Sequence, residues 1–138
     1  MSGGENHNDP MVGIVLVSHS ASLADGLAEL AGQMAGPSVG IIAVGGAPTG
    51  GLGTDEDAVR AAIRRADRGH GVVVLADLGS SVLTAKAYLA EHDHPADVRL
   101  ADAPFVEGAV SAAVTASSGA SLAEVLAAAE EARGVSKL

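Results

Sequence analysis

Short runs of apolar residues alternate along this chain with longer segments in which apolar side chains recur every three or four positions. The short runs predict buried β-strands, and the periodic segments predict amphipathic helices. The predicted strands are Val12–Val17, Gly40–Val44, Gly71–Ala76 and Val98–Ala101. The predicted helices are Ser22–Ala35, Asp55–Asp67, Ser81–Glu91, Val106–Ser117 and Leu122–Arg133. Strands that are apolar on both faces and alternate with helices indicate an α/β fold with a covered parallel sheet.

The predicted architecture is a flavodoxin-like, doubly wound and mainly parallel sheet with helices on both faces. Right-handed crossovers in a sheet of this size favour the strand order 2-1-3-4. The topological switch point then lies between the first and third strands, and such sheets bind ligands beyond the carboxyl ends of their strands at that point. We therefore expect the functional residues at this edge.

Local capping residues predict where the helices begin and end. Gly36, followed by proline, is expected to end the first helix, and Gly69 is expected to close the second. Thr54 offers a capping hydroxyl at the start of the second helix. Ser121 and Glu124 have the spacing of a capping box at the start of the last helix.

The length of 138 residues is typical of one domain. Residues Met1–Pro10 are polar and lack periodicity, so we interpret them as a flexible tail that precedes one domain at residues 11–138. A hydrophobic fraction of 48% is enough to build a core, which argues against disorder as the main state.

The charge balance limits the possible partners. The chain has 8 basic and 17 acidic residues and a formal net charge of −9, so its surface repels nucleic-acid phosphates and anionic lipids. We therefore expect no nucleic-acid and no membrane partner. The sequence has no cysteine and shows no secretion signal or long apolar span, so we expect a soluble, cytoplasmic protein.

Two side chains with chemical potential follow predicted strands at the switch point. His19 follows the first strand, and Asp77 follows the third. A carboxylate that accepts the proton of one imidazole nitrogen fixes the tautomer and leaves the other nitrogen free to attack. We predict that Asp77 orients the ring and that His19 is the nucleophile. The residues alone leave ordinary roles open, as a loop histidine and as an Asx turn or helix cap.

The segments expected to line the crevice suggest which ligand it binds. The glycine-rich loop from Gly45 to Thr54 can present backbone amides to an anion, although no Walker-type or dinucleotide-binding glycine pattern is present. Lysine and arginine are absent from Ser18–Ser22, Gly45–Asp55, Asp77–Ser81 and Asp102–Glu107. This absence argues against tight nucleotide binding and fits a site that accepts a phosphoryl group and soon gives it up.

Three segments together resemble the phosphotransferase subunit of phosphoenolpyruvate-dependent dihydroxyacetone kinase, a family similar to the mannose-type IIA domains of the bacterial sugar phosphotransferase system. They are Ile14–Ser20, Asp77–Ser81 and Asp102–Ala109. The resemblance implies a homodimeric phosphotransferase without a cofactor, in which His19 accepts a phosphoryl group from HPr. The acceptor would be ADP on the nucleotide-binding subunit of the kinase. Some members continue into HPr-like domains, whereas the sequence ends at Leu138, so we expect separate proteins to supply the phosphoryl group.

The resemblance also implies roles for individual residues. Asp77 matches the acid that hydrogen-bonds the imidazole. Ser80 and Ser81 lie where a helix start faces the phosphoryl group. The predicted phosphoryl-binding residues are Ser20, Gly79, Ser80 and Ser81.

Other functions remain open from the residues themselves. Small tetrapyrrole metal chelatases also begin with a strand that delivers a histidine, but they need further ligands, and no second histidine ends a predicted strand. The pair His92 and His94 lacks an obvious third ligand, so we expect no metal site. A serine hydrolase built on Ser18 or Ser20 lacks the required elbow motif and a separate histidine base. A non-catalytic dimerisation module is the remaining alternative.

Overall fold

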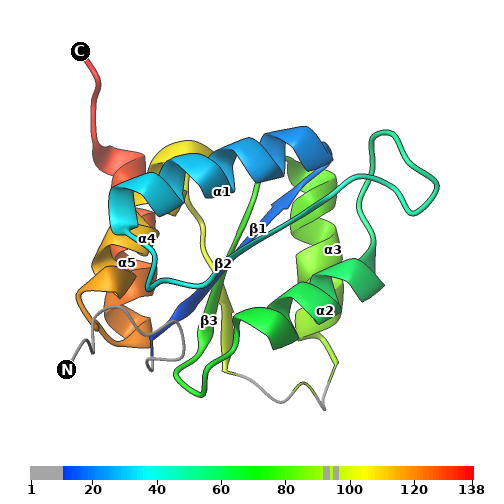
Figure 1. Cartoon of the computed structure of the whole chain (residues 1–138). Helices are drawn as coiled ribbons and strands as arrows, with labels where there is room; N and C mark the ends of the chain where they lie inside the picture. Colours follow the sequence, from blue (N-terminus) through cyan, green and yellow to red (C-terminus); the bar gives the residue numbers. More distant parts are fainter. Residues whose placement is uncertain (1–10, 92–93, 95–96) are drawn as a thin grey trace.

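Four parallel strands form the centre of the protein. The computed structural model describes residues 11–91, 94 and 97–138, so the predicted tail Met1–Pro10 lies outside the described residues. The strands are β1 (Gly13–Ser18), β2 (Ile41–Gly45), β3 (Val72–Ala76) and β4 (Val98–Leu100). They form one 4-stranded sheet in the order β2-β1-β3-β4, and each neighbouring pair is parallel (Figure 1). The predicted α/β class and strand order are confirmed.

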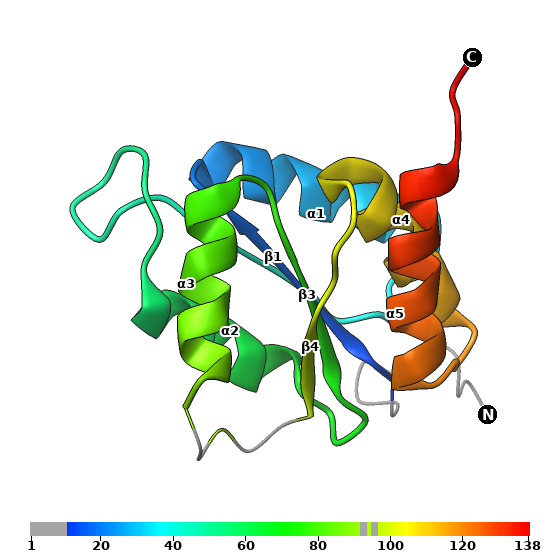
Figure 2. The same ribbon diagram turned by 180° about the vertical axis from the view of Figure 1, so that it is seen from behind.

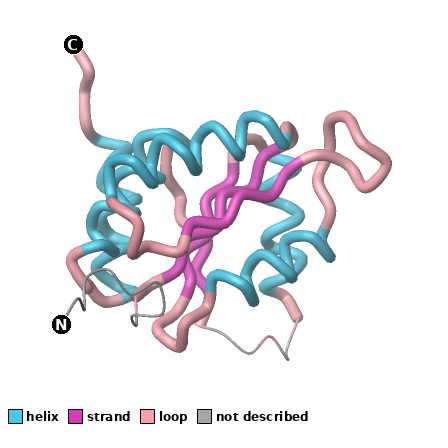
Figure 3. The backbone as a smooth tube through the Cα atoms, viewed as in Figure 1, coloured by secondary structure: helices cyan, strands magenta, loops and turns pink. Residues whose placement is uncertain are grey.

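Helices cover both faces of this sheet. They are α1 (Ala21–Ala35), α2 (Glu56–Ala66), α3 (Gly79–Leu89), α4 (Phe105–Ser117), α5 (Leu122–Glu131) and the short 3-10 helix η2 (Ala132–Gly134). α1, α4 and α5 lie on one face, and α2 and α3 lie on the other (Figures 1 and 2). Figure 3 shows the strands running between these two helical layers. In the part of the chain that the structure describes, no helix has the length and apolar character needed to cross a membrane.

The central strand β1 is buried along its whole length because both of its faces are covered. Ile14 and Leu16 pack into the core beneath α1, α4 and α5. Val15 and Val17 point the other way, into the core beneath α2 and α3. This alternation explains why the strand is a continuous apolar run, and it holds the end of β1 firmly in place for the residues that follow.

Several predicted helix ends are confirmed. Gly36 terminates α1 with a φ of 93°, a conformation that glycine adopts readily. Ser121 and Glu124 form the complete capping box at the start of α5, since each side chain accepts a hydrogen bond from the other residue's backbone amide.

Two predictions about α2 are wrong. Its N-cap is Asp55, whose carboxylate accepts from the amide of Asp57, whereas the hydroxyl of Thr54 is hydrogen-bonded to that of Thr84 at 2.8 Å. The helix ends with Asp67 as its C-cap, and Gly69 lies beyond it in the following turn. The contact with α3 has taken the Thr54 hydroxyl away from the capping role, and this contact joins segments distant in sequence.

Gly13 is a position where a side chain has no room. A Cβ atom there would lie 2.2 Å from the carbonyl oxygen of Ala66, which belongs to the backbone of α2 and cannot rotate away. We expect Gly13→Ala to lower the free energy of unfolding by about 3 kcal/mol, because overpacking of a rigid contact forces the strand and helix apart. The chain has no tryptophan and a single tyrosine, so urea unfolding is best followed by circular dichroism.

Gly26→Ala is the matched control. Gly26 is exposed within α1, and an added Cβ would meet no atom within 4 Å. This substitution is expected to stabilise the protein by about 0.5 to 1 kcal/mol through helix propensity. Equal urea midpoints for Gly13→Ala and the wild type would show that β1 and α2 are not in the close contact described.

Candidate active site

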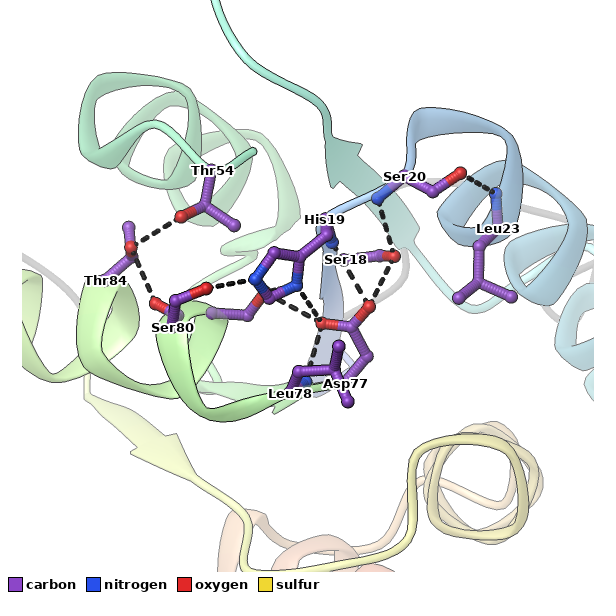
Figure 4. Close-up of polar contacts among 10 residues, drawn as sticks. Ser18, His19, Ser20, Leu23, Thr54, Asp77, Leu78, Ser80 and Thr84 are labelled. Atoms are coloured by element: carbon purple, nitrogen blue, oxygen red, sulfur yellow. Dashed lines mark hydrogen bonds and ion pairs between the residues drawn. The ribbon is translucent and has the colours of Figure 1, made fainter. Parts of the chain in front are cut away.

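The carboxyl ends of β1 and β3 bring two residues together that are distant in sequence. Val17 is paired with Ala76 in the parallel register, so the residues beyond these strands emerge side by side. Nδ1 of His19 lies 3.0 Å from Oδ1 of Asp77, although the two residues are 58 positions apart (Figure 4). The predicted convergence of His19 and Asp77 at the switch point is confirmed, while their catalytic roles stay predictions.

Asp77 accepts hydrogen bonds at both carboxylate oxygens. Oδ2 accepts from the hydroxyl of Ser18 at 2.7 Å and from the amide of His19 at 3.2 Å. Oδ1 accepts from the amide of Leu78 at 2.7 Å and from the hydroxyl of Ser81 at 2.8 Å. Burial alone would raise the pKa of Asp77, but the hydrogen bonds from Ser18, Ser81 and His19 outweigh it and hold that pKa well below its usual range. The carboxylate is therefore ionised.

These contacts determine the tautomer of the His19 ring. An ionised carboxylate can only accept, so Nδ1 must carry the proton that faces Asp77. The other nitrogen, Nε2, is in contact with the hydroxyl of Ser80, which can donate to its lone pair. The side chain of His19 is 22% exposed, whereas that of Asp77 is 9% exposed. The ring thus keeps its protonated edge inside and presents the nitrogen with the lone pair near the surface.

The first turn of α3 lies beside Nε2. Its N-cap is Leu78, which makes no side-chain hydrogen bond to the helix amides. The amides of a first turn have no partner within their own helix and form its positive end, so they attract anions. Gly79 and Ser80 are exposed there. An anionic group on Nε2 of His19 would therefore meet the Ser80 hydroxyl and the start of α3.

Glycines support the turn that carries His19. A Cβ on Gly45, at the end of β2, would lie 2.8 Å from the carbonyl oxygens of Ser18 and Ser20, so only glycine lets β2 approach this turn. The amide of Gly53 donates to the carbonyl oxygen of His19 at 2.9 Å. Together with the Thr54 contact to α3, this bond fastens the glycine-rich loop beside the site.

The predicted phosphoryl-binding residues occupy different places. Ser80 faces Nε2, and Gly79 starts the adjacent helix. Ser20 is the N-cap of α1 and accepts from the amide of Leu23 at 3.2 Å, so phosphoryl binding by its hydroxyl stays a prediction. The hydroxyl of Ser81 points to Asp77 and to Nδ1 of His19, so phosphoryl binding by this side chain stays a prediction.

Sequence reasoning missed the role of Ser18 in this network. The sequence suggests for Ser18 only the role of a hydrolase nucleophile, for which the required motif is missing, but Ser18 is fully buried and hydrogen-bonded to Asp77. A polar residue at the end of an otherwise apolar buried strand was the available signal, because a buried hydroxyl needs a partner.

The segment that follows β4 contains no lysine or arginine, so the sequence predicts no cation beside it. The structure places an arginine there. Arg133, from η2, donates to the carboxylate of Asp102 at 2.6 Å. The amide of Asp102 donates to Glu130 of α5 at 3.0 Å. The sequence segment itself contains no basic residue, but the fold brings one to it from the C-terminal helices.

Within residues 11–91, 94 and 97–138, no three histidine or acidic side chains are grouped so that they can hold a metal ion. Of the pair suggested by the sequence, His92 lies outside the described residues, and the ring of His94 packs at a tilt against the ring of Tyr88, with centroids 5.3 Å apart.

Most of the chain matches the model of a known protein family. Residues 13–126 match the model of EIIA-man, described as the PTS system fructose IIA component. The chain belongs to the EIIA-man family. His19 and Asp77 both lie within the matched residues of this EIIA-man domain. The resemblance to IIA domains predicted from three sequence segments is confirmed.

Two curated relatives are similar over most of the EIIA-man chain. The phosphoryl donor subunit DhaM of the PEP-dependent dihydroxyacetone kinase of Providencia stuartii is 40% identical over 88% of this chain, which spans 27% of that relative. The corresponding subunit of dihydroxyacetone kinase 2 of Listeria innocua is 38% identical over 75% of this chain, and 85% of that relative is covered. The chain thus spans about a quarter of the longer relative and most of the shorter one.

A solved structure shares the fold. The crystal structure of a protein of unknown function, EF1359, superposes on the EIIA-man chain with a TM-score of 0.78 and 37% sequence identity, covering 88% of this chain and 95% of that one. The architecture described above is therefore shared by a close structural neighbour.

Proposed function

We propose that this chain is a phosphohistidine carrier and thus a phosphotransferase. His19 accepts a phosphoryl group from HPr and passes it to ADP bound on the nucleotide-binding subunit of a dihydroxyacetone kinase, in the cytoplasm. The names of the relatives in Providencia stuartii and Listeria innocua support this choice of reaction. The observation that carries the proposal is the ring of His19, whose Nδ1 is held by Asp77 while Nε2 faces the start of α3.

The first transfer begins with the neutral ring of His19. The lone pair of Nε2 attacks the phosphorus atom of the donor phosphohistidine in line with the donor's P–N bond. A new P–N bond forms at Nε2 as the old one breaks, and the donor nitrogen leaves with the electron pair. No proton has to be removed from Nε2, because Nδ1 already carries the ring proton toward Asp77.

The phosphorylated ring carries a positive charge and its phosphoryl group carries negative charge. Asp77 can stabilise the first, and the Ser80 hydroxyl can stabilise the second. Phosphorylation at Nε2 turns the ring of His19 into a cation, which the ionised carboxylate of Asp77 stabilises through Nδ1. The phosphoryl oxygens are anionic, and the hydroxyl of Ser80, in the first turn of α3, lies on their side of the ring. Neutral donors of this kind stabilise the group moderately, so it stays transferable.

The second transfer reverses the bonding at His19. A terminal phosphate oxygen of ADP attacks the phosphorus atom, the P–N bond to Nε2 breaks, and the ring returns to its neutral form with Nδ1 still protonated. ATP is thereby formed on the partner subunit. Nδ1 of His19 keeps the same proton throughout, hydrogen-bonded to Asp77, so the site is ready for another phosphoryl group without a proton exchange.

A homodimer is part of this proposal. α1 packs beside α4, and both helices carry large apolar side chains on their exposed sides. These side chains are Leu30, Met34, Val106 and Val114. A second copy of the chain would remove this apolar surface from water.

A reconstituted relay tests the proposed function. Wild-type protein is mixed with labelled phosphoenolpyruvate, enzyme I and HPr, and then with the ADP-loaded nucleotide subunit of the kinase. We expect acid-labile label that requires HPr, with phosphorus on Nε2 by phosphorus NMR, and loss of the label to ADP. If the protein takes up no label although HPr is active, the result would contradict the proposal and favour a non-catalytic dimerisation module.

A further inference from the structure

Two buried serines surround Asp77 from different parts of the chain. Ser18 is the last residue of β1, and Ser81 lies in the first turn of α3. Both side chains are polar and fully buried, with an exposed fraction of 0%. Each donates to a different oxygen of Asp77, Ser18 to Oδ2 and Ser81 to Oδ1.

The direction of the Ser18 hydrogen bonds is fixed by its neighbour. The amide of Ser20 donates to the hydroxyl oxygen of Ser18 at 3.0 Å, and an amide can only donate. The single hydroxyl proton of Ser18 is therefore directed to Asp77. The backbone turn that follows β1 is thus linked through Ser18 to one carboxylate oxygen.

Ser81 acts on the other carboxylate oxygen and on the ring at once. Its hydroxyl proton is directed to Oδ1 of Asp77, and its oxygen lies 3.0 Å from Nδ1 of His19. Since that proton is in use, the oxygen of Ser81 offers only lone pairs to the ring. A proton on Nδ1 of His19 then has two acceptors, Oδ1 of Asp77 and the oxygen of Ser81. A lone pair on Nδ1 in place of that proton would have no hydrogen-bond donor beside it.

We propose that Ser18 and Ser81 are positioning residues for phosphoryl transfer, which act through Asp77 to keep the proton of His19 on Nδ1 and Nε2 free for attack. This inference rests on the proposed carrier function. The two hydroxyls hold the carboxylate in one rotation, so that Oδ1 stays within hydrogen-bond distance of Nδ1. A carboxylate held only by the amides of His19 and Leu78 has fewer constraints on its side-chain rotation.

A purely structural role makes a different prediction. Hydroxyls that only satisfy a buried carboxylate would lower stability when removed, but would leave the ring tautomer and the transfer rate unchanged. The measurements that separate the two roles are therefore the protonation of the ring nitrogens, by nitrogen-15 NMR of histidine-labelled protein, and the initial rate of label transfer from phosphorylated HPr.

The test compares Ser18→Ala and Ser81→Ala with Ser121→Ala. Ser121 caps α5 and has no contact with Asp77, and loss of an N-cap lowers stability by a comparable amount without touching the site. We expect wild-type protein and Ser121→Ala to show the Nδ1–H ring and equal transfer rates. Each of the other variants should gain a population of the Nε2–H ring and transfer at least about tenfold more slowly, as expected for loss of a hydrogen bond to a charged group.

Two results would overturn the inference while the carrier function stands. One is that Ser18→Ala and Ser81→Ala both transfer at the wild-type rate and both keep the proton of the His19 ring on Nδ1. The other is an Nε2–H ring in phosphorylation-competent wild-type protein, a measurement that needs no variant to fold. Ser81→Thr, which keeps the hydroxyl, should restore the Nδ1–H ring if it folds. Failure of the carrier function itself would appear separately, as wild-type protein that takes no label at all.

Discussion

A His19→Ala variant is expected to take up no phosphoryl group from HPr, with labelling below about a thousandth of the wild-type rate because the nucleophile is gone. In the structure Nε2 of His19 is the nitrogen that faces Ser80 and the start of α3, and its ring proton is held on the opposite edge by Asp77. No neighbouring side chain can replace this arrangement, since the two serines bonded to Asp77 are fully buried and the lowered pKa of Asp77 makes its carboxylate a weak base. Acid-labile label after incubation with phosphoenolpyruvate, enzyme I and HPr measures the effect.

His70→Ala is the matched control for this experiment. His70 is exposed and precedes β3, at the edge of the sheet opposite to the carboxyl ends of the strands. Labelling of this variant should equal that of the wild type. If His19→Ala were labelled as fast as the wild type, the phosphoryl group would reside elsewhere, and both the site and the carrier mechanism would be wrong.

The second large effect is expected for Asp77→Asn, which keeps the shape of the side chain and removes its charge. All the groups around Asp77 donate to it, so an amide NH₂ in place of either oxygen would face a donor. The ring of His19 loses the acceptor that selects Nδ1–H, and the phosphorylated ring loses its balancing charge. We expect the rate of phosphoryl uptake to fall by about a hundredfold to ten-thousandfold, as for other carboxylates that orient a catalytic histidine.

Asp102→Asn provides the comparison for loss of a carboxylate. Asp102 also follows a strand, but its side chain is 81% exposed and paired with Arg133 at the surface. Its transfer rate should remain that of the wild type, and circular dichroism should show both variants folded at the assay temperature. An Asp77→Asn rate within about twofold of the wild type would show that the contact between Asp77 and Nδ1 has no part in the transfer step.

The positions of His19 and Asp77 could be predicted because both follow strands that are apolar on each face. Such strands lie in the interior of a parallel sheet, and in the order 2-1-3-4 the first and third strands are neighbours. The pairing of Val17 with Ala76 then leaves the next residues side by side. Topology alone was sufficient here, because the direction of a strand end does not depend on side-chain detail.

The hydrogen bonds of the serines could not be predicted in the same way. α3 begins at Gly79, two residues before the predicted start at Ser81. Each residue of a helix turns the side chain by about 100°, so the exact start decides which serine faces which side of a neighbouring ring. Ser80 therefore meets Nε2 of His19, and Ser81 meets Nδ1 and Asp77.

The capping of α2 shows the same dependence on contacts between distant segments. Thr54 has the right residue type for an N-cap, and its local sequence favours that role. In the folded chain its hydroxyl is bonded to Thr84 of α3, and Asp55 caps the helix instead. A local preference worth about 1 kcal/mol is easily overruled by a contact that only the packed helices create.

The sequence by itself determined the α/β class, the order of the strands and the edge at which an imidazole and a carboxylate meet, because hydrophobic periodicity is a local residue pattern and crossover handedness follows from the right-handed twist of strands in general. Only the tertiary structure decided which ring nitrogen is free, which hydroxyls hold Asp77 and which residue caps α2. Those features depend on how helices pack against strand ends, and the direction of a hydrogen bond is set by atoms that meet only in the folded protein.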